Sequence, residues 1–586
     1  MIEKNITITI IMGFFDSSSS SSEGGSGSDS DSESDSGGER SMGTYDVAII
    51  GGGIAGLYTA YKLSNEHKII LFEKQTKDSD KEDDSHLEDE KDSDGDIESN
   101  GENKETKISL GGRIKTKKID DDVFIEEGAA RIHNNHTLIN RLIEHLGLKG
   151  KGMYFNLSPD VTRILRGTPY IQLNGVKEGG GKKKKKNTKK KNTKKKTTKK
   201  KTTKKKMDKS SPSDEDISSD EEEDGVLRSS RQTSIKFPYH THYQLDVKTL
   251  VNKAEKGPKD KTYFEHLKDN YDLETARFIR DAFGYDSELN KLNSEAAYEM
   301  FKDSFFDDGD YYMLKNGLVQ IIDKLHKRLE KSGNVTFVNC EITKIDKNGT
   351  ELTDNMKETY TCTNLVCAIP KKPLQSLKYF KEDLLTQVDT HPLLRIYMKY
   401  PVPSEGVWFK NMKRTITDNF IRHIIPLPPE KGIIMISYTD GPTADMLNSQ
   451  QNDDALTEML HSEIEKLYGV TPPKPEKIYK AYWKEGLSLW NTKANMEETH
   501  TKLLQPNPNE NVFICGDSYS KQQGWIEGAL QTSEEVIKKI TREDNPEFPY
   551  SDEIASVRND DRGGDDSDSD DSDDSDDSDD GSDDDE

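Results

Sequence analysis

The stretch YDVAIIGGGIAGLYTAYKLSNEHKIILFE, residues 45–73, decides the fold class of this chain. Residues 46–50 form a short apolar run rich in isoleucine, which is typical of a buried parallel strand. Residues 68–72 form a second run of the same kind. With a helix over residues 54–64 between them, the stretch predicts a strand, a turn, a helix and a strand, which together form one unit of an α/β domain.

The glycines between the two strands indicate a nucleotide site. Gly51, Gly53 and Gly56 form the pattern G-x-G-x-x-G. The first glycine permits a tight turn, the second lets the backbone approach a pyrophosphate, and the third lets the helix pack on the strand. The N-terminus of the helix would direct free N–H groups at the phosphates, and Glu73 is placed to bind a ribose hydroxyl. The alternative is a tight turn in an α/β domain that binds no nucleotide.

The composition divides the chain into folded and charged parts. Of 586 residues, 31% are hydrophobic and 33% are charged, and the net charge is −25. This length exceeds one ordinary domain, and the polar tracts cannot bury enough apolar surface to fold. No apolar run approaches the length of a membrane span. We therefore predict an enzyme-sized core interrupted by unstructured insertions.

The predicted organisation alternates segments of two domains with charged tracts. Tracts expected to lack structure are residues 1–42, 76–107, 177–228 and 546–586. The nucleotide-binding domain would use residues 43–75, 311–390 and 506–545, the substrate domain would use the helical residues 229–310 and the strand-rich residues 391–505, and residues 108–176 would serve both.

A lysine repeat, residues 182–206, begins within the second insertion. Such a run could bind nucleic acid or another anionic surface by releasing counterions. No aromatic residues are interleaved to stack on bases, which favours a solvated loop that pairs with the acidic tracts.

The four cysteines indicate buried free thiols. Cys340, Cys362, Cys367 and Cys515 lie in or beside apolar runs, with no spacing for zinc and no disulfide framework. This favours an intracellular location. Residues 6–15 are apolar, but a basic start and a cleavage site for secretion are missing, which argues against secretion.

Three separated segments resemble the flavin amine oxidase family, which includes monoamine and polyamine oxidases and L-amino-acid oxidases. These are the dinucleotide unit, LGGRIKT at residues 110–116 and ICGDSYSKQQGWIEGA at residues 514–529. NLVCAIP and MLKNGLVQIIDKL resemble two further family segments. The resemblance implies an α/β fold with a doubly wound, Rossmann-type FAD-binding domain and a substrate domain of mixed sheet and helices.

The resemblance also implies FAD as the cofactor. The residues implied to bind it are Gly51, Gly53, Ile54, Ala55, Gly56, Glu73, Gly112, Arg113, Ile342, Gly516, Asp517, Trp525, Ile526 and Ala529. Monoamine oxidases carry flavin on a cysteine near the position of Ser488. No cysteine occurs there, which implies non-covalent FAD.

A second set of residues concerns the substrate. GAARI resembles the segment in which L-amino-acid oxidases carry an arginine, which implies that Arg131 binds a substrate carboxylate in a bidentate fork and that Tyr438 supports it. The alternative for Arg131 is a structural ion pair with Glu126 or Glu127. Trp490 and Trp525 are placed as aromatic walls beside the flavin, or as plain core residues.

Arg395 departs from the family pattern. RIYMKYPVP resembles the strand in which family members carry a lysine that holds a water against the flavin. Arginine can donate to a water but does not give up its proton, which puts fast reoxidation by oxygen in doubt. The alternative is that Arg395 belongs to a buried ion pair.

The resemblance implies oxidation of an amine, such as the α-amine of an L-amino acid, to an imine with formation of hydrogen peroxide. Two alternatives stay open: a monoamine or polyamine oxidase without carboxylate recognition, and a flavin-binding interaction protein with a vestigial active site. The lysine and aspartate repeats resemble the style of large DNA virus proteomes, with which packaging in a virus particle would be compatible. That impression implies no mechanism.

Overall fold

The computed structural model describes residues 41–74, 108–120, 123–150, 154–156, 161–172, 247–304, 311–543 and 548. Almost all of each predicted charged tract lies outside these residues, including the lysine repeat. In the described part, no helix is long and apolar enough to cross a membrane.

The first sheet is mostly parallel, in agreement with the predicted α/β fold class. Its strands run in the order β10-β2-β1-β13-β12-β11, and β19 pairs with β13. Their bounds are β1 Ser41–Ile50, β2 Ile69–Glu73, β10 Val335–Asn339, β11 Ile342–Ile345, β12 Glu351–Asp354, β13 Thr359–Cys367 and β19 Val512–Ile514. The pairs that join β10, β2, β1, β13 and β19 are parallel, and β11 and β12 add antiparallel pairs. Three distant segments thus build one sheet.

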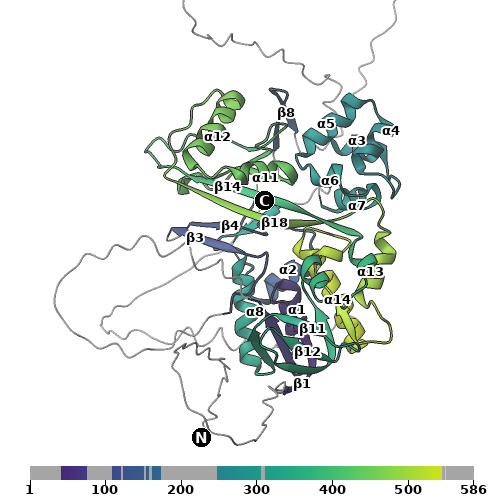
Figure 1. The fold of residues 1–586 in the computed structure, drawn as a ribbon. Helices are drawn as coiled ribbons and strands as arrows, with labels where there is room; N and C mark the ends of the chain where they lie inside the picture. Colours follow the sequence, from purple (N-terminus) through teal and green to yellow (C-terminus); the bar gives the residue numbers. More distant parts are fainter. Residues whose placement is uncertain are drawn as a thin grey trace, which may run out of the picture. The chain divides into compact units, whose positions relative to one another are not determined.

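Helices on one face of this sheet explain its continuous apolar strands. These are α1 Ile54–Leu63, α2 Thr137–His145, α8 Val319–Ser332 and α14 Ile526–Thr541, which share one apolar core with the strands. Parallel strands covered on both faces have little need for polar positions. In Figure 1, α1 in purple and α14 in yellow lie side by side although they come from opposite ends of the folded part.

Short helices and a second apolar core cover the other face. They are α9 Lys371–Ser376, α10 Glu382–Leu385 and α13 Met496–Leu504. All four cysteines are free and buried, as predicted.

The second sheet is mixed and carries the long strands. Its order is β18-β14-β17-β16-β15-β7-β8, and only the β15–β7 pair is parallel. The bounds are β7 Val161–Leu165, β8 Thr168–Gln172, β14 Val388–Lys399, β15 Arg414–Thr417, β16 His423–Pro426, β17 Ile433–Asp440 and β18 Lys477–Trp490. The helices α11 Gly441–Ser449 and α12 Asp453–Tyr468 follow β17, and the 3-10 turn Pro429–Lys431 precedes it. Residues 391–505, which the sequence predicts to be rich in strands, contribute five of the strands of this sheet.

Residues 247–304 form a helical segment of five helices: α3 Val247–Ala254, α4 Tyr263–Asn270, α5 Leu273–Phe283, α6 Ser287–Asn290 and α7 Ser294–Ser304. Sequence signals define their ends. The Thr262 side chain and Glu265 form a capping box on α4, and Asp272 caps α5. Two small sheets complete the fold: β3 Thr116–Asp120 with β4 Val123–Glu126, and β5 Ile132–His133 with β9 Tyr311–Leu314 and β6 Tyr154–Asn156.

Residues 335–346 form two strands, β10 and β11, which pair at opposite edges of the first sheet. The last helix, α14, begins at Ile526, because Gly524 has a φ of +78° and Trp525 is the extended N-cap.

Candidate active site

One cavity collects most of the predicted site residues. It is bounded by the first sheet, the second sheet and the helical segment. The predicted residues that line it are Gly51, Gly53, Ile54, Ala55, Glu73, Gly112, Arg113, Arg131, Arg395, Tyr438, Gly516, Asp517, Trp525, Ile526 and Ala529. Gly56, Ile342 and Trp490 do not line it.

The glycine turn after β1 presents bare backbone to the cavity. Gly51 has a φ of +109°, and a Cβ there would lie 2.6 Å from the carbonyl oxygen of Ala368. A Cβ at Gly53 would meet no protein atom within 4 Å, because that position opens into the cavity. Gly56 serves packing instead, since its Cβ would lie 2.0 Å from the Gly51 oxygen. The three glycines therefore differ in their surroundings, in a way that is compatible with the three roles that their spacing predicts.

Two helix N-termini open into the cavity without side-chain caps. Helix α1 begins after Gly53 and has no acidic residue in its first turn. Helix α14 begins after Trp525 and also lacks a side-chain cap. Uncapped N–H groups and the helix dipole favour an anion at both places.

Glu73 lies at the end of β2 and faces the turn. Its carboxylate accepts a hydrogen bond from the N–H of Gly52. Burial raises the pKa of Glu73 to about 7, and the Gly52 hydrogen bond only partly offsets this. A ligand hydroxyl that donates to this carboxyl would therefore stabilise its charged form.

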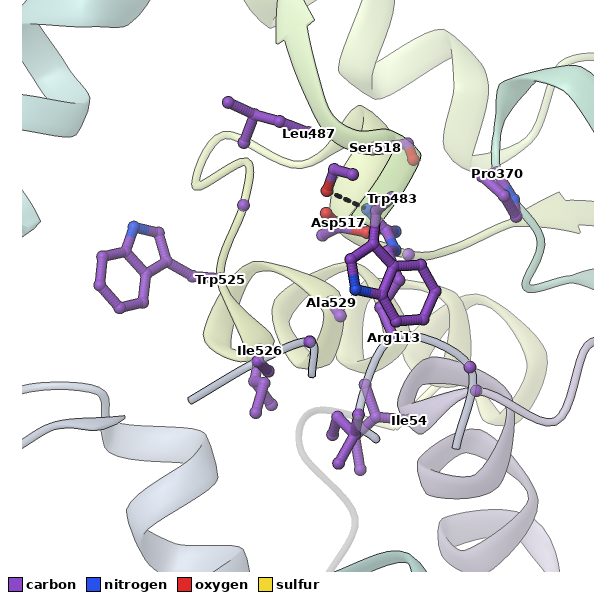
Figure 2. A pocket seen from close by; sticks show the side chains of 18 of the residues that line it. Ile54, Arg113, Pro370, Trp483, Leu487, Asp517, Ser518, Trp525, Ile526 and Ala529 are labelled. Atoms are coloured by element: carbon purple, nitrogen blue, oxygen red, sulfur yellow. Dashed lines mark hydrogen bonds and ion pairs between the residues drawn. The ribbon is translucent and has the colours of Figure 1, made fainter. Parts of the chain in front are cut away.

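Arg113 and Asp517 close the opposite wall. The guanidinium donates to the Asp517 carboxylate, and Figure 2 shows this contact together with Trp483, Ser518 and Ala529 in the cavity lining. Gly516, with a φ of +127°, again offers open space where a Cβ would stand. Backbone and guanidinium groups thus surround the space that an extended, phosphate-bearing ligand would need.

Ile342 and Trp490 lie in the protein core. Ile342 is 5% exposed and pairs with Asp354 between β11 and β12. Trp490 is 1% exposed, and its indole N–H donates to the Ser520 carbonyl at 3.0 Å. For Trp490 the core alternative fits the structure, and the cavity wall is formed by other aromatic residues.

Arg131 stands at the other end of the cavity. One Nη donates to the Tyr285 hydroxyl at 2.9 Å, and the guanidinium carbon lies 4.9 Å from the Tyr311 ring centre and 5.7 Å from that of Trp525. The predicted alternative, an ion pair with Glu126 or Glu127, is wrong. Those carboxylates bind other groups.

Glu126 and Glu127 have partners of their own. Glu126 accepts from the Thr116 hydroxyl at 2.7 Å and from the N–H of Leu318 at 2.6 Å, and Glu127 pairs with Lys115 at 2.9 Å. Arg131 is therefore a cation in the cavity with aromatic and hydroxyl neighbours.

Arg395 is 6% exposed and is held by backbone groups. Its Nη1 donates to the carbonyls of Glu126 and Gly128, and its guanidinium carbon lies 4.8 Å from the ring centre of Tyr438. The predicted ion-pair alternative is therefore wrong, since no acid within the described ranges forms an ion pair with Arg395. Burial, followed by Tyr285, raises the pKa of Tyr438 to about 12, so its hydroxyl stays protonated.

Tyr285, Glu288 and Trp483 are among the lining residues that sequence reasoning missed. Trp483 donates its indole N–H to the Glu127 carbonyl at 2.7 Å, and Figure 2 shows its ring in the cavity lining. Tyr285 and Glu288 come from the short α5–α6 region, where no spacing signal marks them. Within the described ranges, no cluster of side chains could hold a metal ion.

The geometry defines a class of protein before any comparison is made. A doubly wound sheet with two uncapped helix N-termini, bare glycine backbone and a ribose-facing acid fits a dinucleotide. The adjoining cavity beneath a second sheet offers room for a substrate. These features are typical of a dinucleotide-binding protein with an adjoining ligand cavity.

Family models agree with this class. Residues 105–536 match the flavin containing amine oxidoreductases, and residues 49–77 match the NAD(P)-binding Rossmann-like domain. The chain belongs to the flavin-containing amine oxidoreductase family. It is therefore an FAD-dependent amine oxidoreductase that acts on a small-molecule amine.

Solved structures share the fold at low sequence identity. Wild-type putrescine oxidase bound to putrescine matches with a TM-score of 0.56 and 11% identity, over 86% of this chain and 100% of that chain. A double mutant of putrescine oxidase matches with a TM-score of 0.57, 11% identity and the same coverage. A putative protoporphyrinogen oxidase from Exiguobacterium sp. 255-15 matches with a TM-score of 0.54 and 14% identity, over 86% and 99%. At these identities the likeness concerns the fold alone.

Proposed function

We propose that this enzyme oxidises the α-amine of an L-amino acid to an imine, which water hydrolyses, with hydrogen peroxide as the co-product of oxygen reduction. The observation that carries the proposal is the Arg131 guanidinium in the cavity, enclosed by rings and bound to a hydroxyl rather than to an acid.

A cation in this setting favours an anionic ligand. Moving a charge out of water is costly unless a partner of opposite charge compensates it. A carboxylate meets a guanidinium in two parallel hydrogen bonds, which fixes orientation as well as charge. Arg131 would thereby hold the substrate carboxylate, and the adjoining Tyr285 and Tyr438 hydroxyls would support it.

FAD, when bound, supplies a hydride acceptor for the carbon that bears the amine. The protein positions the substrate. Arg131 orients the α-carbon, while Trp483, Trp525 and Leu487 surround the ligand and exclude water. We expect the FAD to be non-covalent, because no cysteine is among the described residues that line the cavity. Acid precipitation should then leave the flavin in the supernatant.

The test replaces the guanidinium and keeps the bulk. We expect Arg131→Met to lower kcat/KM for L-norleucine by about 1000-fold, because a buried charge partner is lost, while pentylamine is affected by about threefold or less. Anaerobic flavin reduction measures both. Arg277→Met, at an exposed position on α5, is the control for loss of a positive charge. Full activity of Arg131→Met on norleucine would overturn the proposal.

A second candidate is an amine oxidase that does not recognise a carboxylate. The buried Glu288 carboxyl in the cavity favours it, because an acid there suits a cationic amine. The two candidates differ in one comparison: a diamine would reduce the flavin faster than the amino acid of equal chain length.

A further inference from the structure

Glu288, on the short helix α6, is a cavity-lining acid with one carboxyl oxygen, Oε2, that has no hydrogen-bond partner. We propose that Glu288 binds a second, cationic nitrogen of the substrate, so that the enzyme selects α-amino acids with a basic side chain. This rests on the proposed function, since Arg131 is taken to hold the α-carboxylate.

The surroundings of Glu288 separate it from structural acids. Glu288 is 7% exposed, and its Oε2 is buried with no hydrogen-bond partner. Its two acidic neighbours are satisfied. Asp286 pairs with Arg422 at 2.6 Å, and the Asp440 carboxylate accepts from the N–H groups of Asp286 at 3.1 Å and Ser287 at 2.6 Å. Of these three acids, Glu288 alone lines the cavity.

A buried carboxyl oxygen without a hydrogen-bond partner costs free energy unless a ligand supplies the donor. The carboxyl gives up its hydration on burial, and an unmade hydrogen bond costs about 1–3 kcal/mol. Burial, reinforced by Asp440, holds the pKa of Glu288 well above its usual range. A bound cation would favour the ionised form, and the pair would interact strongly away from water.

The chemistry assigns the cation to a nitrogen that does not react. An amine must be neutral when its carbon loses a hydride, because an ammonium has no lone pair to stabilise the product. A carboxylate that binds a lasting positive charge therefore serves another nitrogen. Glu288 belongs to the helical segment, as do Tyr285 and Met300, whereas the glycine turn and α14 hold the nucleotide. Met300 and Leu393 offer apolar contact for the methylene chain between the two nitrogens.

The three recognition groups together specify the substrate class. Arg131 matches a carboxylate, Glu288 matches a distal ammonium or guanidinium, and the apolar lining residues match a short alkyl chain. A basic L-amino acid carries all three features. A diamine carries only the nitrogen and the chain.

The experiment measures binding to the FAD-loaded enzyme without turnover. The probes are α-methyl-L-lysine and α-methyl-L-norleucine, which lack the α-hydrogen and cannot be oxidised. They differ only in the distal ammonium. We expect the wild type to prefer the lysine probe by about 100-fold in Kd by calorimetry, as a buried charge pair provides. Glu288→Gln should remove this preference and leave the Kd of the norleucine probe within about threefold.

Matched controls keep the result interpretable. Glu288→Gln keeps the size and shape of the side chain, so flavin content and melting temperature should stay at wild-type values. Glu299→Gln removes a charge from the same helical segment at a surface ion pair with Lys256, and should leave the preference intact. If Glu288→Gln does not fold, the wild type still provides a test, because equal Kd values for the two probes would overturn the proposal.

Three results would overturn the proposal. The first two are equal Kd values for both probes in the wild type and a preference for the lysine probe that survives Glu288→Gln. The third is an equal loss of affinity for both probes in Glu288→Gln, which would make Glu288 a partner of the α-nitrogen. Failure of the proposed function gives a different result. In that case neither amino acid probe binds, while 1,5-diaminopentane reduces the flavin. A loss of diamine affinity in Glu288→Gln would then still support the role of Glu288.

Discussion

The two ends of the cavity differ in the groups that line them: backbone groups at one end and side chains at the other. At the nucleotide end the protein offers backbone: bare glycines, two uncapped helix N-termini and a tight turn, with Glu73 and Arg113 as the main side chains. At the substrate end it offers side chains, namely Arg131, Glu288 and a group of aromatic residues. Backbone placement follows from local spacing, whereas side-chain placement depends on which distant elements meet. The predictions below test this division.

The largest expected effect comes from Gly53. A Cβ there meets open space, so a larger side chain would obstruct the ligand rather than the fold. We expect Gly53→Val to weaken FAD binding by at least about 1000-fold, because the backbone can no longer approach a pyrophosphate. Flavin absorbance of the purified protein measures the loss. The melting temperature of the FAD-free protein should stay near that of FAD-free wild type.

Gly56→Ala is the matched comparison. Its Cβ would lie 2.0 Å from the Gly51 oxygen, so it should destabilise the FAD-free fold by about 1–3 kcal/mol. Stoichiometric flavin in Gly53→Val, or equal destabilisation by both changes, would contradict the separate roles of the two glycines.

The next effect concerns Glu126, which joins the two ends. Its side chain binds Thr116 and the N-cap of α8, and its carbonyl accepts from Arg395 and Tyr397. Burial raises its pKa from 4.5 to about 7, against the hydrogen bonds that lower it. The folded protein then binds more protons than the unfolded chain between these values, so its free energy of unfolding falls as pH rises from about 4.5 through about 7.

Glu126→Gln should remove this dependence. Between pH 5 and 8, we expect the free energy of unfolding of the wild type to fall by up to about 3 kcal/mol relative to that of the variant. This follows from a pKa difference of about 2.5 between the folded and unfolded states. Urea unfolding across this range measures it. Parallel curves for the two proteins would show that the carboxyl titrates normally.

The sequence predicted the nucleotide end in detail because the evidence is local. Gly51, Gly53 and Gly56 lie within six residues of one another, and their spacing alone determines which one turns, which one faces the ligand and which one packs. The family resemblance implied Arg113 and Asp517 through separate motifs. It also assigned Ile342 to the cofactor, and the cavity does not reach that residue.

The substrate end was less predictable because long-range contacts set it. Glu288 lies on a helix of four residues. The start of this helix is held by Asp440 at the end of β17, which accepts hydrogen bonds from the N–H groups of Asp286 and Ser287. The choice between Trp483 and Trp490 shows a second limit. Both lie in β18, but the strand register shifts between them, so simple alternation does not say which one faces the cavity.

The two tryptophans provide the third prediction. Trp490→Phe should lower the free energy of unfolding by about 2 kcal/mol, because the buried Ser520 carbonyl loses its donor, and leave substrate affinity unchanged. Trp483→Phe should instead raise the substrate Kd by about fivefold with little change in stability. Thermal unfolding and anaerobic flavin titration separate the two. A change in substrate Kd caused by Trp490→Phe would contradict the assignment of Trp490 to the core.

The smallest expected effect concerns Arg395, where the substrate end departs most from the family pattern. Two backbone carbonyls and the Tyr438 ring hold its guanidinium, which cannot donate its proton at working pH. Arg395→Lys would place a smaller ammonium there, which can hold a water and exchange a proton. We expect reaction of the reduced enzyme with oxygen to become about tenfold faster, through better stabilisation of developing negative charge. Reduction by substrate should change less, and stopped-flow measurement of the two half-reactions distinguishes them. An unchanged or slower oxygen reaction would mean that the arginine already serves this step, and that its replacement of lysine reflects the carbonyls that it binds.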